Sequence, residues 1–283
     1  MNVYEIVTEK IIKQLESGVA PWRKPWTTLA PMNMVSKRPY TGINVLLLAS
    51  QGYASPCWLT YKQAAKIGKH VKKGEHGSLV VFWKIDEYSK ANKETGELEN
   101  RSSAMLRYYT VFNASQCEGL ESLNLGTNKT PIETCERILA GFQNAPMLEQ
   151  GDRASYAPSR DVVTMPARGS FSSIEAYYAT LFHELTHSTG HSSRLDRPGF
   201  DAPVHFGSES YSREELVAEL GASMLCGFAG IDPSLLDNSA SYLQSWISKL
   251  RGDSKLIVQA ASAAQKATKL ILGETAEESD TES

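Results

Sequence analysis

The stretch His183-Glu184-Leu185-Thr186-His187 is the most informative part of this chain. Residues four apart lie on the same face of a helix, so both histidines can reach one metal ion. Glu184 would then lie beside the ion, where a base is needed to take a proton from metal-bound water. An apolar helical pattern precedes the motif, and Gly190 stands where a helix would end. The motif predicts a helical metal site with ligands His183 and His187 and Glu184 as the catalytic base.

Such a site needs a third protein ligand. The metzincin pattern would place a histidine six residues after His187, but that position is Ser193, so that class is disfavoured. His191 lies four residues after His187 and is an alternative ligand. Gly190 lies between the two histidines, and we expect it to turn the chain away.

A second helix is the preferred source of the third ligand. The segment 211–225 reads as a helix with Ser212 as its N-cap and Glu215 at the capping-box position. We expect Glu215 to bind the metal and Glu219, one turn later, to orient a ligand histidine, with the exchange of these roles as an alternative. This arrangement resembles that of the gluzincins. The competing interpretation is a solvated helix face on which Arg213 pairs with the glutamates.

Composition sets the class of protein. The 283 residues suffice for two ordinary domains, and the contents of 41% hydrophobic and 22% charged residues are those of a globular protein. The four cysteines show no regular spacing, which favours buried thiols in a reducing compartment. We expect no signal peptide, because the chain starts as a charged amphipathic helix, and no membrane span. These features predict a cytoplasmic protein.

Charge divides the chain into two unlike parts. Between residues 21 and 84, ten lysines and arginines accompany one acid, a net charge of +9, and four of the five tryptophans lie there. From residue 119 onward the net charge is −9. Basic residues interleaved with aromatic ones suit single-stranded nucleic acid, because cations follow the phosphates while rings stack on the bases.

The candidate DNA-binding residues share this basic, aromatic part of the chain. They are Trp22, Arg23, Lys24, Trp26, Arg38, Tyr40, Asn44, Lys62, Lys69, Lys72 and Lys73. The competing interpretation places the tryptophans in the core and the lysines on a merely solvated face. Trp58 and Trp83 are expected to be structural.

The order of predicted elements indicates an α+β protein. We expect an N-terminal α/β nucleic-acid-binding domain (1–125), a mostly helical zincin-like domain with a small β-sheet (131–273), and an acidic, disordered tail (274–283). The predicted elements are helices at 2–17, 44–50, 58–68 and 132–142, a long hairpin with strands 78–85 and 104–113, and a hairpin at 154–165. An edge strand is expected just before the motif helix, where it could pair with an extended peptide.

Several short motifs together resemble the ArdC-type antirestriction proteins. Tyr40-Thr-Gly-Ile-Asn44, Lys73-Gly-Glu-His-Gly77 and Tyr109-Thr-Val-Phe-Asn113 resemble the N-terminal domain of that family, and the HELTH motif and Glu214-Glu-Leu-Val-Ala-Glu219 resemble its zincin-like domain. The resemblance spans roughly residues 3–270. It implies a plasmid-borne protein whose first domain binds single-stranded DNA and which shields incoming DNA from host restriction during conjugation.

The expected cofactor is one divalent ion, Zn²⁺ first and Mn²⁺ second. Expected partners are single-stranded DNA and a host restriction component or other protein substrate. A different class remains open: an intracellular zinc metallopeptidase whose basic domain only recruits acidic proteins. A third interpretation is a replication accessory protein with an inert zincin domain.

Overall fold

The structure is a computed structural model. It describes residues 1–23, 30–91, 98–120, 130–198, 200, 209–232 and 239–274, with only the backbone for 86–88, 90–91, 98–102, 104 and 209–210. The predicted acidic tail therefore lies almost wholly outside the described residues.

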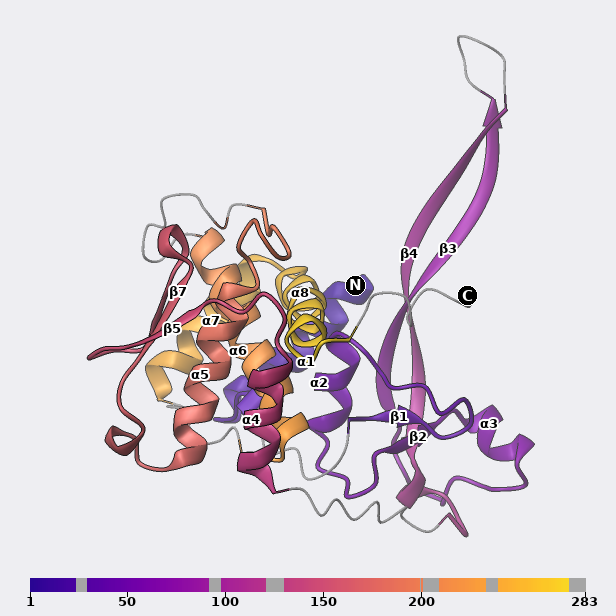
Figure 1. Ribbon diagram of the computed structural model, residues 1–283. Coiled ribbons are helices and arrows are strands. Elements are labelled where there is room, and N and C mark those ends of the chain that lie inside the picture. Colours follow the sequence, from indigo (N-terminus) through magenta and orange to yellow (C-terminus); the bar gives the residue numbers. More distant parts are fainter. Residues whose placement is uncertain are drawn as a thin grey trace.

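The N-terminal region surrounds a four-stranded sheet with the strand order β1-β2-β4-β3. Its elements are α1 (Val3–Glu16), η1 (Pro21–Arg23), β1 (Met32–Asn33), α2 (Ile43–Ala49), β2 (Cys57–Leu59), α3 (Tyr61–Lys66), β3 (Ser78–Ala91), β4 (Leu98–Asn113) and η2 (Ala114–Gln116). Strands β3 and β4 form one long antiparallel hairpin that projects away from the rest of the protein (Figure 1).

The C-terminal region is mostly helical and carries a three-stranded sheet with the order β5-β7-β6. Its elements are α4 (Pro131–Gly141), β5 (Met147–Gln150), β6 (Ser155–Ala157), η3 (Pro158–Arg160), β7 (Val162–Met165), η4 (Arg168–Ser170), α5 (Ile174–Ser188), α6 (Glu209–Ala229), α7 (Ala240–Gly252) and α8 (Leu256–Ile271). The α+β fold predicted from the sequence is confirmed.

One hydrophobic core joins the two regions. It contains Ile11 and Leu15 of α1 together with Leu220 of α6, Ile247 of α7 and Ile257 of α8, all at most 5% exposed. Helix α1 packs directly against α7, and α6 packs against both α5 and α8. The N-terminal region thus buries its first helix against residues more than 200 positions later in the chain.

Three local predictions were wrong. Residues 57–66 form a strand followed by a short helix, because Thr60 caps α3 with Gln63 in a capping box and so starts the helix there. The strand before the motif helix, β7, is not an edge strand, because β5 pairs with it on one side and β6 on the other. Helix α6 begins at Glu209, so Ser212 lies inside it and is not its N-cap.

The structure also bears on the cysteines and on the possibility of a membrane span. Cys57, Cys117, Cys135 and Cys226 are all buried free thiols, and the structure forms no disulfide among them. Among the described residues, every helix is too short or too polar to cross a lipid bilayer.

Candidate metal centre and nucleic-acid interface

Helix α5 presents the two histidines of the motif toward a neighbouring helix. Its N-terminus is capped by the Ser173 side chain, which accepts a hydrogen bond from the backbone of Ala176. The opposite face is anchored in a second core through Leu181, Phe182 and Leu185, each at most 2% exposed. This anchoring fixes the rotation of the helix about its axis, and therefore the direction of both histidine side chains.

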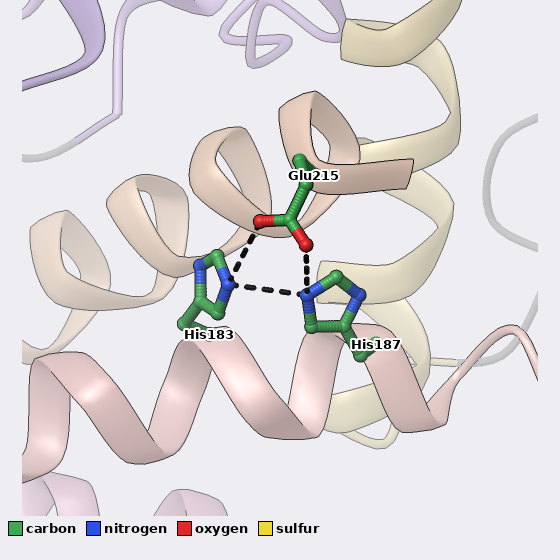
Figure 2. Close-up of side chains that lie close together, drawn as sticks. All are labelled: His183, His187 and Glu215. Carbon is green, nitrogen blue, oxygen red and sulfur yellow. Dashed lines mark hydrogen bonds and ion pairs between the residues drawn. The ribbon is translucent and has the colours of Figure 1, made fainter. Parts of the chain in front are cut away.

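The two histidines and Glu215 of α6 converge on one point, as Figure 2 shows. The Nε2 atoms of His183 and His187 lie 3.1 Å apart. One Glu215 carboxylate oxygen lies 3.6 Å from the Nε2 of His183, and the other lies 3.7 Å from that of His187. The three predicted ligands are therefore assembled by two helices that are separated in sequence.

This spacing fits a single small divalent ion. Nitrogen and oxygen ligands bind zinc at about 2.0–2.2 Å, so two ligands of a tetrahedral ion lie about 3.3–3.6 Å apart. The observed separations of 3.1, 3.6 and 3.7 Å are close to these values. Three protein ligands leave the fourth tetrahedral position open, which is typical of catalytic zinc sites and not of structural ones.

The electrostatics of the cluster favour a cation. Burial alone would lower the pKa of His183, yet a hydrogen bond with Glu215 and the charge of Glu184 raise it above its usual value. Burial would likewise raise the pKa of Glu215, but the two histidines hold it below its usual value. The acids that stabilise a protonated histidine here would stabilise a divalent ion in the same way.

Glu184 and Tyr211 border this cluster. Glu184 follows His183 on α5 and is only 8% exposed. Tyr211 lies one helical turn before Glu215. Burial, the Glu215 carboxylate and the more distant charge of Glu184 raise the pKa of Tyr211 to about 12, so its hydroxyl stays protonated and bonds to Glu215. Sequence reasoning missed Tyr211, although its position four residues before Glu215 was available as a signal.

Glu214, and not the Glu219 predicted from the sequence, contacts the second ring nitrogen of His187. The Nδ1 of His187 lies 3.2 Å from a Glu214 carboxylate oxygen, which leaves Nε2 to face the metal position. Arg197 binds both oxygens of Glu214, donates to the His187 carbonyl and so fixes the carboxylate against the end of α5. Glu219 instead pairs with Arg23. The adjacent acids thus approach His187 from two sides, Glu214 at Nδ1 and Glu215 at Nε2.

His191 does not join the metal cluster. The described residues that could share an ion are His183, His187 and Glu215, whereas the His191 Nδ1 lies 2.8 Å from the Ser193 hydroxyl. Helix α5 ends at Ser188, and the chain turns at Gly190 as the sequence suggested. A Cβ atom at Gly190 would lie 2.5 Å from the Phe200 ring and 2.8 Å from the Arg197 guanidinium, so this glycine also makes room for both side chains.

A second glycine sets the distance between the two metal-site helices. A Cβ atom on Gly221 of α6 would lie 2.4 Å from the Thr186 methyl group of α5, far inside normal contact distance. Thr186 is completely buried. Only glycine allows α5 and α6 to approach this closely, and the approach brings Glu215 within reach of the histidines.

Two of the predicted DNA-binding residues are not on the surface. Trp22 is completely buried against Trp246, and its indole nitrogen donates to the Tyr242 hydroxyl at 3.0 Å. Arg23 is 8% exposed and forms its salt bridge with Glu219. Both residues link the N-terminal region to the C-terminal helices, so neither is available to bases or phosphates.

Asn44 also has a structural role. Its side-chain amide donates to the Val81 carbonyl at 2.6 Å and accepts from the Val81 amide at 2.7 Å, which clamps α2 to the hairpin. Trp83 was expected to be structural, but its side chain is 53% exposed, and its ring makes an edge contact with Tyr4. Trp58 is buried, as expected.

The remaining candidates lie on the surface or outside the described residues. Tyr40 is half-buried, and Arg38, Lys62 and Lys73 are exposed. Two lysines bind backbone carbonyls at 2.8 Å, Lys69 that of Gly119 and Lys72 that of Ser115, which ties the loop after α3 to the end of the hairpin. Lys24 and Trp26 lie outside the described residues.

Each of the two regions matches a known protein-domain family. Residues 1–112 match the N-terminal domain of anti-restriction factor ArdC, and residues 133–263 match a zincin-like metallopeptidase domain. The protein therefore combines an ArdC-type N-terminal domain with a zincin-like domain whose helices carry the cluster described above.

Individual relatives contain both regions together. The chain is 40% identical to the DNA primase TraC of Escherichia coli over 93% of its own length but only 19% of that protein's, and a second TraC of the same species is matched over 27% of its length. It is 36% identical to the uncharacterized protein y4eC of Sinorhizobium fredii (strain NBRC 101917 / NGR234) over 94% of this chain and 90% of the relative.

Solved structures of an ArdC protein match nearly the whole chain. The metal-free crystal structure of the antirestriction ArdC protein from plasmid R388 superposes with a TM-score of 0.76 at 40% identity, covering 98% of this chain and 99% of the other. The Mn(II)-bound structure of that protein gives a TM-score of 0.74 at 39% identity. This chain belongs to the ArdC family of antirestriction proteins.

Proposed function

We propose that this protein binds single-stranded DNA through its N-terminal region and protects incoming plasmid DNA from host restriction, with a metal-dependent peptidase site in its C-terminal region. The convergence of His183, His187 and Glu215 beside Glu184 supports the peptidase site. The net charge of +9 between residues 21 and 84 supports the DNA-binding region. The buried free thiols fit a cytoplasmic location.

His183, His187 and Glu215 would hold one divalent ion. Two imidazoles and one carboxylate suit zinc, and Mn²⁺ is the alternative because the R388 protein has been crystallised with that ion. When bound, the ion supplies Lewis acidity, which polarises a carbonyl and makes water more acidic. Glu214 and Arg197 keep His187 in the tautomer that this binding requires.

Glu184 would carry the proton in peptide hydrolysis. Its carboxylate takes a proton from the attacking water as oxygen adds to the peptide carbonyl, and gives it to the leaving amine as the C–N bond breaks. The net reaction consumes one water molecule. Because Glu184 is not a ligand in this scheme, Glu184→Gln is expected to abolish hydrolysis while the protein keeps its metal.

Metal content tests the ligand assignment. We expect His183→Ala protein to bind less than one equivalent of Zn²⁺ by elemental analysis, because one of three protein ligands is lost. His191→Ala is the matched control, since that imidazole contacts Ser193 and lies outside the cluster. Unchanged stoichiometry in His183→Ala protein would refute the metal site.

Protection of DNA during transfer tests the overall function. A plasmid is conjugated into a restricting host that contains either the wild type, Glu184→Gln or Glu215→Ala, and transfer efficiency is compared with that into a non-restricting host. If the peptidase site is needed for protection, both variants restore restriction. If DNA binding alone protects, both variants protect like the wild type. A wild type without protective effect contradicts the proposal.

A second function of a different class is a zinc peptidase whose basic region recruits acidic proteins. The exposed lysines at positions 62 and 73 would serve either partner. The two functions differ in one measurable property, because a recruitment surface has no preference for single-stranded over duplex DNA. Binding of both forms with equal affinity by the full-length protein would favour the peptidase.

A further inference from the structure

A small cavity opens where α2 meets the part of the hairpin nearest the body of the protein. Its volume is about 280 Å³, just below the range of pockets that enclose drug-sized molecules. A single planar ring is therefore a more suitable occupant than a larger ligand. The lining residues include Tyr40, Thr41, Asn44, Phe82, Tyr109 and Val111.

Three of the side chains that line this cavity are aromatic. Phe82 and Tyr109 stack face to face, with ring centroids 4.4 Å apart and planes within 5° of parallel. Tyr109 is 57% exposed although it is a large ring on a sheet, so part of its surface is available for contact. Tyr40 closes another side and packs against the small core beneath the sheet. Three rings around one opening are suited to stacking on a flat heterocycle.

Cations extend from the cavity along the same face of the hairpin. Arg107 is the direct cross-strand partner of Phe82, and Met105 is that of Lys84. Side chains of directly paired residues, and of every second residue along a strand, point to the same side of a sheet. Tyr109, Phe82, Arg107 and Lys84 therefore share one face, on which rings and positive charges are neighbours. This pattern matches a strand whose bases stack while its phosphates meet cations.

The amide groups of the lining are already engaged within the protein. The Asn44 side chain uses both its oxygen and its nitrogen on Val81. Asn33 accepts hydrogen bonds from the backbone of Val35 and Ser36. Because these groups are occupied, the cavity offers ring surfaces in preference to hydrogen-bond readout, and such a site accepts any base.

We propose that this cavity binds a nucleobase of single-stranded DNA, stacked against the Phe82–Tyr109 pair and beside Tyr40, with Arg107 and Lys84 receiving the adjoining phosphates. The inference rests on the proposed DNA-binding function and assigns that function to a specific place. A duplex keeps its bases stacked inside the helix, so the cavity discriminates against it.

Neighbouring tyrosines on one strand provide a matched test. Tyr108 and Tyr109 are 51% and 57% exposed, but they point to opposite faces of the hairpin. Binding of full-length protein to a fluorescein-labelled oligothymidylate is measured by anisotropy at fixed salt, and folding of each variant is checked by thermal melting. Tyr109→Ala is expected to weaken binding about 5- to 150-fold, the value of one stacked base, whereas Tyr108→Ala has no effect. Tyr109→Phe keeps the ring and should bind like the wild type.

An abasic strand of the same length separates stacking from electrostatics. The penalty of Tyr109→Ala should vanish on this strand, because no base remains to stack. Arg107→Gln should reduce the salt dependence of binding on both strands, because a phosphate contact is lost. If the wild type binds oligothymidylate but Tyr109→Ala and Tyr108→Ala behave alike, the cavity assignment is wrong while DNA binding stands. If the wild type binds no single strand, both proposals fail.

Discussion

Arg23 and Glu219 form a salt bridge that connects the N-terminal region to the helix of the candidate metal site. The Arg23 Nη2 donates to both carboxylate oxygens of Glu219, at 2.9 and 3.0 Å. Their side chains are only 8% and 10% exposed, and the Arg23 guanidinium also lies over the Tyr242 ring, 4.1 Å from its centroid. Glu219 follows Glu215 by one helical turn, so the pair lies next to the proposed ligand.

Removal of one partner should destabilise the protein strongly. Arg23→Ala leaves a buried carboxylate without its counter-charge, which costs about 3–5 kcal/mol, measured by urea unfolding. Replacing both residues, as in Arg23→Met with Glu219→Leu, should cost less because no charge remains buried. The exposed pair Arg251–Glu16 is the control, and Arg251→Ala should cost at most about 1 kcal/mol. Equal costs for the two arginine variants would contradict the role of burial.

Glu214 should matter for metal affinity although it is not a proposed ligand. Glu214→Ala removes the hydrogen-bond partner of His187 Nδ1 and frees Arg197, so the affinity for Zn²⁺ should fall about 10- to 100-fold. Competition with a chromophoric chelator measures this affinity. Arg213→Ala is the control on the same helix, because its side chain contacts Gln259 and Asp253. Similar affinities for the two variants would refute the orienting role.

Gly221→Ala should be destabilising despite the better helix propensity of alanine. The propensity gain is about 1 kcal/mol, but the new Cβ atom would lie 2.4 Å from Thr186, and overpacking typically costs about 1–3 kcal/mol. Adding Thr186→Ala removes the clashing methyl and should restore stability and metal affinity together. Gly252→Ala has open space around it and should be neutral or stabilising. A stabilising Gly221→Ala, measured by thermal melting, would show that the helices can separate without cost.

Asp161 should make stability depend on pH. Burial would raise the pKa of Asp161, but hydrogen bonds from Arg194 and Tyr156 outweigh it and hold the pKa below its usual value near 3.8. A carboxylate with a depressed pKa contributes stability above its unfolded pKa and loses it as the pH falls through the folded pKa. Asp161 has φ of 50°, which asparagine also tolerates. The destabilisation by Asp161→Asn should therefore be full at pH 5–7 and shrink below about pH 4. A pH-independent difference in urea unfolding would contradict this.

The sequence predicted those helices and strands whose patterns of apolar and polar residues lie within a short segment of the chain. The HELTH spacing required a helix with both histidines on one face, and α5 has that form. The strand-like segments 78–85 and 104–113 predicted the β3–β4 hairpin, whose strands extend further, to Ala91 and from Leu98. Both predictions depend only on the period of side-chain direction along a helix or strand, which is a property of the local sequence.

Features that depend on tertiary contacts could not be predicted in this way. Trp22 and Arg23 looked like a basic, aromatic DNA site, and nothing local indicates that Tyr242 and Glu219 meet them. The choice between Glu214 and Glu219 as the partner of His187 depends on the rotation of α6, which the close approach at Gly221 sets. The order of strands in a sheet is another such property. Strand β5 was not predicted from the sequence, yet it pairs with β7, which therefore is not an edge strand.

The core shared by the two regions has a consequence for synthesis of the protein. Helix α1 leaves the ribosome well before its partners α7 and α8, which are made more than 200 residues later. Until then Val7, Ile11 and Leu15 lack the part of their native surroundings that α7 and α8 supply, and incompletely covered apolar segments invite aggregation and chaperone binding. Closing so long a loop also slows folding. In a ribosome-bound nascent chain, α1 should therefore remain protease-sensitive until α8 has emerged from the exit tunnel.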